Sequence, residues 1–173
     1  SRRTAPPEQD ILLGDYGLFA ARIKCRDLDA AHAWFLRERL DVLSEPTSDP
    51  NGLRHFFVRD PYGLIFDIVE GEEWFSTQNH LMGGPSGCMI GVSDIERART
   101  VYSDLLGYDE VVYDETGTFG DLESLPSEGK AKVRRVLLRH QQPRKGPFSR
   151  LLGRSQIELI KVYDRVPDAI FTN

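Results

Sequence analysis

The sequence predicts an α+β fold made of two βαβββ modules, and three observations support this prediction. An aspartate that can cap a helix occurs twice, as Asp27 and Asp94. An aromatic residue follows eight positions later in both cases, as Phe35 and Tyr102, so each residue lies 67 positions from its counterpart. An apolar, alternating segment precedes each aspartate, and further strand-like segments follow each expected helix. This shared offset is typical of an internal duplication.

Composition places the chain among compact folded proteins. The 173 residues are 40% hydrophobic and 28% charged, which is sufficient for a packed core and excludes a wholly disordered chain. No run of 18 apolar residues is present, so we expect no membrane span. Only two cysteines, Cys25 and Cys88, are present. They are too few for a disulfide scaffold, and a cytoplasmic localisation is therefore expected.

The first module is expected over residues 17–71, after a polar, proline-rich arm or linker at 1–16. Its first strand covers 18–25, and Asp27 then caps a helix that extends to about Leu40. Apolar segments predict strands at 42–44, 55–59 and 64–70. The sequence Asp-Pro-Tyr-Gly at 60–63, between the last two strands, is typical of a tight turn.

The second module repeats this order over residues 86–163, between a connector at 72–85 and a tail at 164–173. Asp94 caps its helix and Gly107 ends it. Strands are expected at 88–92, 111–113, 133–138 and 157–162. Insertions at 116–131 and 140–154 make this module longer than the first.

Positive charge is concentrated near the end of the chain. Nine lysines and arginines and no acidic residues occur between Lys130 and Arg154, whereas the whole chain has a net charge of −5. Such a stretch is compatible with a nucleic-acid, phosphate or acidic partner, or with a solvated segment that balances the acidic remainder. We favour the second interpretation. Phe148 is the only aromatic residue of the stretch, so we expect no stacking platform for nucleic acid.

Alternation along the first strand separates two faces. Ile23 and Cys25 share one face with Phe19 and Ala21 and are expected to meet the helix. Ala20, Arg22 and Lys24 share the other face. The corresponding faces of the two modules would together form a concave surface that can hold a ligand.

Three short motifs, together with the repeated βαβββ order, resemble those of the vicinal oxygen chelate superfamily. This superfamily includes glyoxalase I, bleomycin-resistance proteins and extradiol dioxygenases. The three motifs are the turn at 60–63, the segment Val-Ser-Asp-Ile-Glu-Arg-Ala at 92–98 and the segment Tyr-Ser-Asp-Leu-Leu-Gly at 102–107. The resemblance covers residues 17–163. It implies a U-shaped mixed sheet around a ligand cup, with the helices on the outer face. In metal-dependent members of the superfamily, each module supplies one ligand early in its first strand and one in its last strand. The metal then chelates two neighbouring oxygens of the substrate.

Only half of that ligand set is present. The early positions, usually histidine, fall on Ala20 and Gly87, which have no donor side chain. The late positions fall on Asp67 and Glu158, so these two carboxylates are the candidate metal ligands. Three outcomes are open for the cup. The carboxylates hold a divalent ion, they form salt bridges with Arg22 or Lys24, or Arg22 and Lys24 bind a small anionic ligand.

Two functions follow from the resemblance. The first is a metal-dependent lyase, isomerase or dioxygenase that uses Fe, Zn, Mn or Ni and acts on a small substrate with vicinal oxygens. Its missing histidines would come from a second copy in a homodimer, or from further modules if the chain is a piece of a longer protein. The chain opens on Ser1, which is compatible with a piece of a longer protein or with a processed form. The second is a non-catalytic pair of modules that binds a small anion or mediates assembly.

Overall fold

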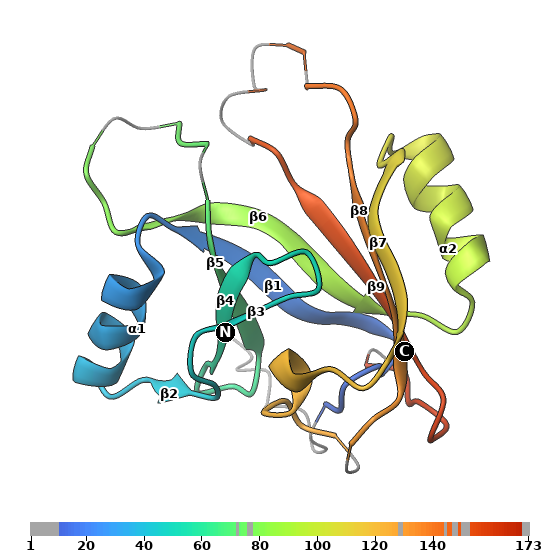
Figure 1. Cartoon of the computed structure of the whole chain (residues 1–173), viewed down its shortest axis with the longest axis horizontal. Coiled ribbons are helices and arrows are strands. Elements are labelled where there is room, and N and C mark those ends of the chain that lie inside the picture. Colours follow the sequence, from blue (N-terminus) through green and yellow to red (C-terminus); the bar gives the residue numbers. More distant parts are fainter. Residues whose placement is uncertain are drawn as a thin grey trace, which may run out of the picture.

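The computed structural model describes residues 11–71, 73–75, 78–127, 130–143, 145–146, 149 and 153–170. Within these residues the chain is an α+β protein in which nine strands form one mixed sheet and two helices lie outside it (Figure 1). The predicted fold class is therefore confirmed. The described helices are too short to cross a membrane.

The first module contains one helix and five strands. Asp27 caps the helix, because its side chain accepts a hydrogen bond from the backbone N–H of Ala30 at 2.9 Å. Asp60 orders the expected tight turn by accepting from the N–H groups of Tyr62 and Leu64. The elements are β1 (Gly17–Cys25), α1 (Leu28–Arg37), β2 (Asp41–Val42), β3 (Thr47–Ser48), β4 (Arg54–Arg59) and β5 (Ile65–Glu70).

The second module repeats this arrangement with longer connections. Asp94 caps the helix by accepting from the N–H of Arg97 at 3.0 Å, and the helix ends in a π-helical turn before Gly107. Gly107 has a φ of +74°, a backbone conformation that glycine adopts without strain. The elements are β6 (Met82–Gly91), α2 (Ile95–Thr100), the π-helical turn η1 (Val101–Leu105), β7 (Glu110–Gly117), the 3₁₀ turn η2 (Gly120–Leu122), β8 (Val133–Arg139) and β9 (Gln156–Val162).

The strand order shows the duplication in space. It runs β2-β4-β5-β1-β6-β9-β8-β7, with β3 paired beside β4. Within each module the first and last strands are parallel neighbours, β1 beside β5 and β6 beside β9. The modules meet where β1 pairs antiparallel with β6, at the centre of the sheet. The ends of the two modules therefore curve around a shared inner face (Figure 1).

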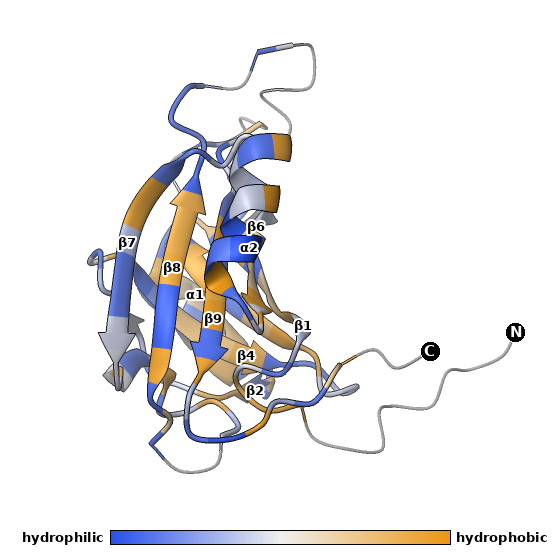
Figure 2. Ribbon diagram, turned by 90° about the vertical axis from the view of Figure 1, so that its right-hand side faces the viewer, coloured by the Kyte–Doolittle hydropathy of each residue, from blue (hydrophilic) through white to orange (hydrophobic). Residues whose placement is uncertain are grey.

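Three apolar clusters account for the packing. One lies between α1 and its strands and contains Leu28, Phe35 and Phe56, and a second, with Ile95 and Leu159, lies under α2. The third fills part of the inner face and contains Phe57, Met89 and Leu122 with the other residues of that cluster. In Figure 2 a hydrophilic band interrupts the apolar surface of β8, where the sequence has two adjacent arginines, 134 and 135.

Several expectations about element positions need adjustment. Strand β6 begins at Met82, inside the expected connector at 72–85, instead of at residue 86. Residues 11–16 are not a free arm, because Leu13 is 2% exposed and Tyr16 bridges to Gly91 and Ala169. Residues 1–10 lie outside the described part. Phe19 packs in the inner cluster instead of under α1, since the register of β1 against β6 shifts between Leu18 and Ala20.

Much of the basic stretch pairs with acids of the same chain. Arg134 contacts Asp114 and Glu96, Arg139 contacts Glu110, and Lys130 contacts Glu123. Arg154 contacts Glu73 at 3.1 Å, Arg135 is described below, and residues 144, 147–148 and 150–152 lie outside the described part. These ion pairs agree with the interpretation that we favoured, in which the stretch balances the acidic remainder.

Candidate functional site

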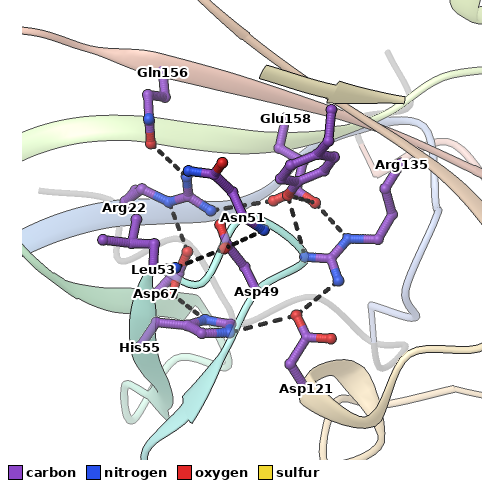
Figure 3. A network of polar contacts seen from close by, with 11 residues as sticks. Arg22, Asp49, Asn51, Leu53, His55, Asp67, Asp121, Arg135, Gln156 and Glu158 are labelled. Atoms are coloured by element: carbon purple, nitrogen blue, oxygen red, sulfur yellow. Dashed lines mark hydrogen bonds and ion pairs between the residues drawn. The ribbon is translucent and has the colours of Figure 1, made fainter. Parts of the chain in front are cut away.

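A single guanidinium group lies between the two carboxylates that the sequence singles out (Figure 3). Arg22 of β1 is in register with Asp67 of the parallel strand β5. Its Nε donates to Asp67 Oδ2 at 2.7 Å, and its Nη2 donates to Glu158 Oε2 at 3.1 Å. Its Nη1 donates to Gln156 Oε1 at 2.9 Å. All three nitrogen atoms therefore bond to side chains of this chain, and Arg22 links the first module to β9 of the second.

A second guanidinium group lies on the other side of Glu158. Arg135 Nε donates to Glu158 Oε1 at 2.6 Å, and Arg135 Nη1 donates to Asp121 Oδ2 at 2.7 Å. The Tyr113 hydroxyl donates to the same Oε1 at 2.9 Å. Burial raises the pKa of Tyr113, so its hydroxyl keeps the proton that it donates. Both oxygens of Glu158 are thus engaged.

His55 closes the network between the modules. Its Nδ1 lies 2.9 Å from Asp67 Oδ1 and its Nε2 lies 3.4 Å from Asp121 Oδ2. Burial alone would lower the pKa of His55, but the hydrogen bonds and negative charges of Asp121 and Asp67 outweigh it and raise the pKa to about 9. His55 is therefore an imidazolium at neutral pH. Burial would likewise raise the pKa of Asp67, but Arg22 and His55 hold it below its usual range.

A tight turn places one more acid beside the network. Asp49, between β3 and β4, accepts through Oδ1 from the N–H groups of Asn51 and Leu53 at 2.9 and 2.8 Å. Its Oδ2 is buried and has no hydrogen-bond partner in the described residues. Burial raises the pKa of Asp49. In Figure 3 this turn is drawn in front of Arg22 and Glu158, and the charges of both residues act on Asp49.

Apart from Asp49, the positive and negative charges of the network are equal in number. It contains three cations, Arg22, Arg135 and His55, and three carboxylates, Asp67, Asp121 and Glu158. Each of the six side chains is at most 6% exposed. Such burial is tolerated when each charge is paired and hydrogen-bonded. Each of the six has an oppositely charged partner and at least one hydrogen bond, although His55 Nε2 is 3.4 Å from Asp121 and has no hydrogen-bond partner among the described residues.

The structure brings together three of the four residues expected from the sequence. Arg22, Asp67 and Glu158 lie in one network, in agreement with the salt-bridge outcome. Lys24 does not join it. Its Nζ donates to the backbone carbonyl of Glu73 at 2.7 Å and lies 5.7 Å from the ring of Trp74.

Sequence reasoning missed four other members of the network: His55, Tyr113, Asp121 and Arg135. Arg135 could have been found, because alternation along β8 places it on the same face as the apolar residues Val133 and Leu137. Asp121 had no such signal, since it lies in an insertion.

The register of the sheet also changes which residues face the carboxylates. Arg22 pairs with Asp67, and Met89 pairs with Glu158 at the corresponding place in the second module. The motif spacing had pointed two residues earlier, to Ala20 and Gly87. A Cβ atom at Gly87 would lie 2.2 Å from the backbone oxygen of Gln156, so a side chain does not fit there.

These residues do not fit a divalent metal ion. Both oxygens of Asp67 and both oxygens of Glu158 are occupied by Arg22, His55 and Arg135. An ion between the carboxylates would also lie against the Arg22 guanidinium. Within the described ranges, no group of three or more His, Cys, Asp or Glu side chains is arranged to hold a metal. We therefore derive no chemical step through a metal.

Comparisons with known proteins agree with the fold. No protein-family model matches the sequence, and no curated protein matches it either. A variant of glyoxalase I from Zea mays superposes with a TM-score of 0.54 at 16% identity, over 91% of this chain and 48% of that one. A candidate dioxygenase from Bacillus subtilis gives a TM-score of 0.51 at 14% identity, over 86% of this chain and 41% of that one.

The chain thus spans less than half the length of these two solved proteins. At 14% and 16% identity the likeness concerns the fold and not the chemistry. The chain thus has a paired-module α+β fold that is similar to the fold of glyoxalase I.

Proposed function

We propose that this chain is a non-catalytic pair of modules that works without a metal and serves in small-molecule binding or in assembly. The observation that carries the proposal is the position of the Arg22 guanidinium between Asp67 and Glu158. A fixed cation already neutralises both acids. Two unit charges about 4 Å apart repel by roughly 4 kcal/mol at an effective dielectric constant of about 20. A divalent ion beside Arg22 would therefore be strongly disfavoured.

We infer that the network stabilises the fold and does not bind a ligand. All three nitrogen atoms of Arg22 are engaged within the chain, and Lys24 is directed to the backbone of Glu73. An anion would have to displace these partners. If the modules bind a small anion, as we propose, the site lies elsewhere on the molecule.

A metal-dependent lyase, isomerase or dioxygenase is the second candidate for the whole protein. One observation favours it: the chain covers only 48% of the Zea mays glyoxalase I chain to which it is similar. A longer protein would have room for a further module pair with complete ligands, and a homodimer could supply them across its interface. In that case Fe, Zn, Mn or Ni would be bound outside the network described above.

Metal analysis of the chain, expressed alone and purified without chelators, tests the proposal. The protein is equilibrated with Mn²⁺ or Zn²⁺, freed of unbound ion by gel filtration and analysed by mass spectrometry for metal. We expect a substoichiometric content that is the same in wild type, in Glu158→Gln and in Glu45→Ala, a control at an acid that is 87% exposed. One ion per chain in the wild type, lost in Glu158→Gln and kept in the control, would overturn the proposal.

A further inference from the structure

A cavity lies between the first insertion of the second module and the outer strands of the first module. Its volume is about 550 Å³, which is within the usual range for small-molecule sites. Its apolar lining includes Leu13, Leu122 and Leu125, which belong to the inner apolar cluster, and Leu43 and Phe119, which pack against that cluster. The cavity therefore has a floor that is continuous with the core of the protein.

Two polar groups at this cavity have unused hydrogen-bonding capacity, and a third, Lys130, is paired. The Ser124 hydroxyl is buried and has no hydrogen-bond partner among the described residues. Arg59 donates through Nε to Asp41 at 2.8 Å, and its two terminal nitrogens have no hydrogen-bond partner among the residues that the structure describes. Lys130 pairs with Glu123 at 3.2 Å, and both of these side chains line the cavity.

The unengaged terminal nitrogens of Arg59 favour an anion. The charges themselves are balanced, because Asp41 pairs with Arg59 and Glu123 pairs with Lys130. A buried hydroxyl without a partner costs free energy, which a ligand oxygen or nitrogen would recover. The terminal nitrogens of a guanidinium are suited to a carboxylate or sulfonate, which they can contact through two parallel hydrogen bonds.

We propose that this cavity binds a small amphipathic anion, with an apolar body on the leucine floor and a carboxylate or similar group near Arg59. Ser124 would act as the buried polar contact that orients the ligand. This inference rests on the binding half of the proposed function and names the place and chemical class of the ligand. It does not use Arg22 or any other member of the buried network.

Fluorescence titration with 1-anilinonaphthalene-8-sulfonate, an anion with an apolar body, tests the proposal on the full chain. We expect saturable binding to one site and displacement by decanoate. Ser124→Phe should abolish binding by filling the cavity. Arg59→Gln should weaken the binding of the sulfonate about five-fold, the effect of an exposed ionic contact of about 1 kcal/mol.

Arg54→Gln is the matched control. Arg54 lies on the same strand and pairs with Asp29, as Arg59 pairs with Asp41, and Glu70 is a further contact at 4.0 Å. Its side chain is 42% exposed, against 39% for Arg59. It should leave binding unchanged, and far-ultraviolet circular dichroism should show that Ser124→Phe is folded. If Ser124→Phe does not fold, the affinities of the other variants for the sulfonate test the proposal. Arg59→Gln and Lys130→Gln should then bind it more weakly than Arg54→Gln does.

Two results would overturn the proposal: no saturable binding in the wild type, or binding that a folded Ser124→Phe variant retains. Equal competition by decanoate and decan-1-ol would also contradict it, since the anionic group would then contribute nothing. These outcomes are separate from the metal measurement. A stoichiometric metal would refute the proposed function whether or not the sulfonate binds.

Discussion

Replacing Arg22 with methionine removes the positive charge that joins the modules and keeps most of the aliphatic side chain. Three hydrogen bonds are lost, two of them to carboxylates that are 0% exposed. Asp67 keeps His55 and Glu158 keeps Arg135, so neither acid is left wholly unpaired. Breaking a buried ion pair by removing one partner costs about 3–5 kcal/mol, and we expect Arg22→Met to lower the free energy of unfolding by that amount.

Urea unfolding, followed by circular dichroism, measures this loss of free energy. Thermal unfolding gives a second measure: for a chain of this size 1 kcal/mol corresponds to about 2–4 °C, so the Tm should fall by roughly 6–20 °C. Arg134→Met is the control. Arg134 contacts Asp114 and Glu96 at 2.7 Å, but its side chain is 24% exposed and its partners are 31% and 64% exposed. Its loss should cost about 1 kcal/mol or less, because water screens exposed pairs.

The comparison of the two variants decides the reasoning. If Arg22→Met and Arg134→Met cost the same, the network has no special structural weight and the buried guanidinium is an accident of packing. If Arg22→Met is more stable than the wild type, the space around Asp67 and Glu158 rearranges readily. Either result would contradict the inference that the buried network around Arg22 stabilises the fold.

Two further predictions test the network and its surroundings. Stability should fall as pH rises above about 6.5, because the His55 pKa is raised to about 9 and its contribution is complete only below the ordinary value. The urea midpoint, measured between about pH 6.5 and 9, should fall with pH in the wild type and change little in His55→Asn. An equal pH dependence in the variant would show that another group titrates. Gly87→Ala should cost about 1–3 kcal/mol, because its Cβ would lie 2.2 Å from the Gln156 carbonyl oxygen. Gly84→Ala, with nothing within 4 Å, should be neutral, and equal Tm values for the two would show that β6 and β9 separate without cost.

The sequence was informative about the fold because each module repeats local signals. Asp27 and Asp94 cap their helices as expected, and Asp60 forms its turn. These features depend on residues within four positions of one another, which single-sequence reasoning can use. Strand β3 and the 3₁₀ turn η2 lacked such a pattern, since elements of two and three residues are too short for a hydrophobic pattern to repeat.

The site was only partly predictable because its contacts are long-range. Asp67 and Arg22 lie 45 positions apart, and Glu158 and Arg22 lie 136 apart. The resemblance singled out both acids, whereas alternation placed Arg22 on the same face. Nothing local connects His55 with Asp121, because their proximity depends on how β4 and η2 meet across the inner face. A pattern within one strand can indicate that a charge is buried, but it does not identify the partner.

A tethered cation differs from a metal ion in a way that bears on function. Arg22 adds its charge to the fold permanently, so the stability of the network does not depend on the concentration of a free ion, as it would in a metal-linked fold. A guanidinium whose three nitrogens are all engaged offers no open position for substrate oxygens. The arrangement that holds the modules together thus also closes the place where chelation would occur. Ligand binding by this chain would then have to use another part of the molecule, and the cavity beside Arg59 and Ser124 provides one.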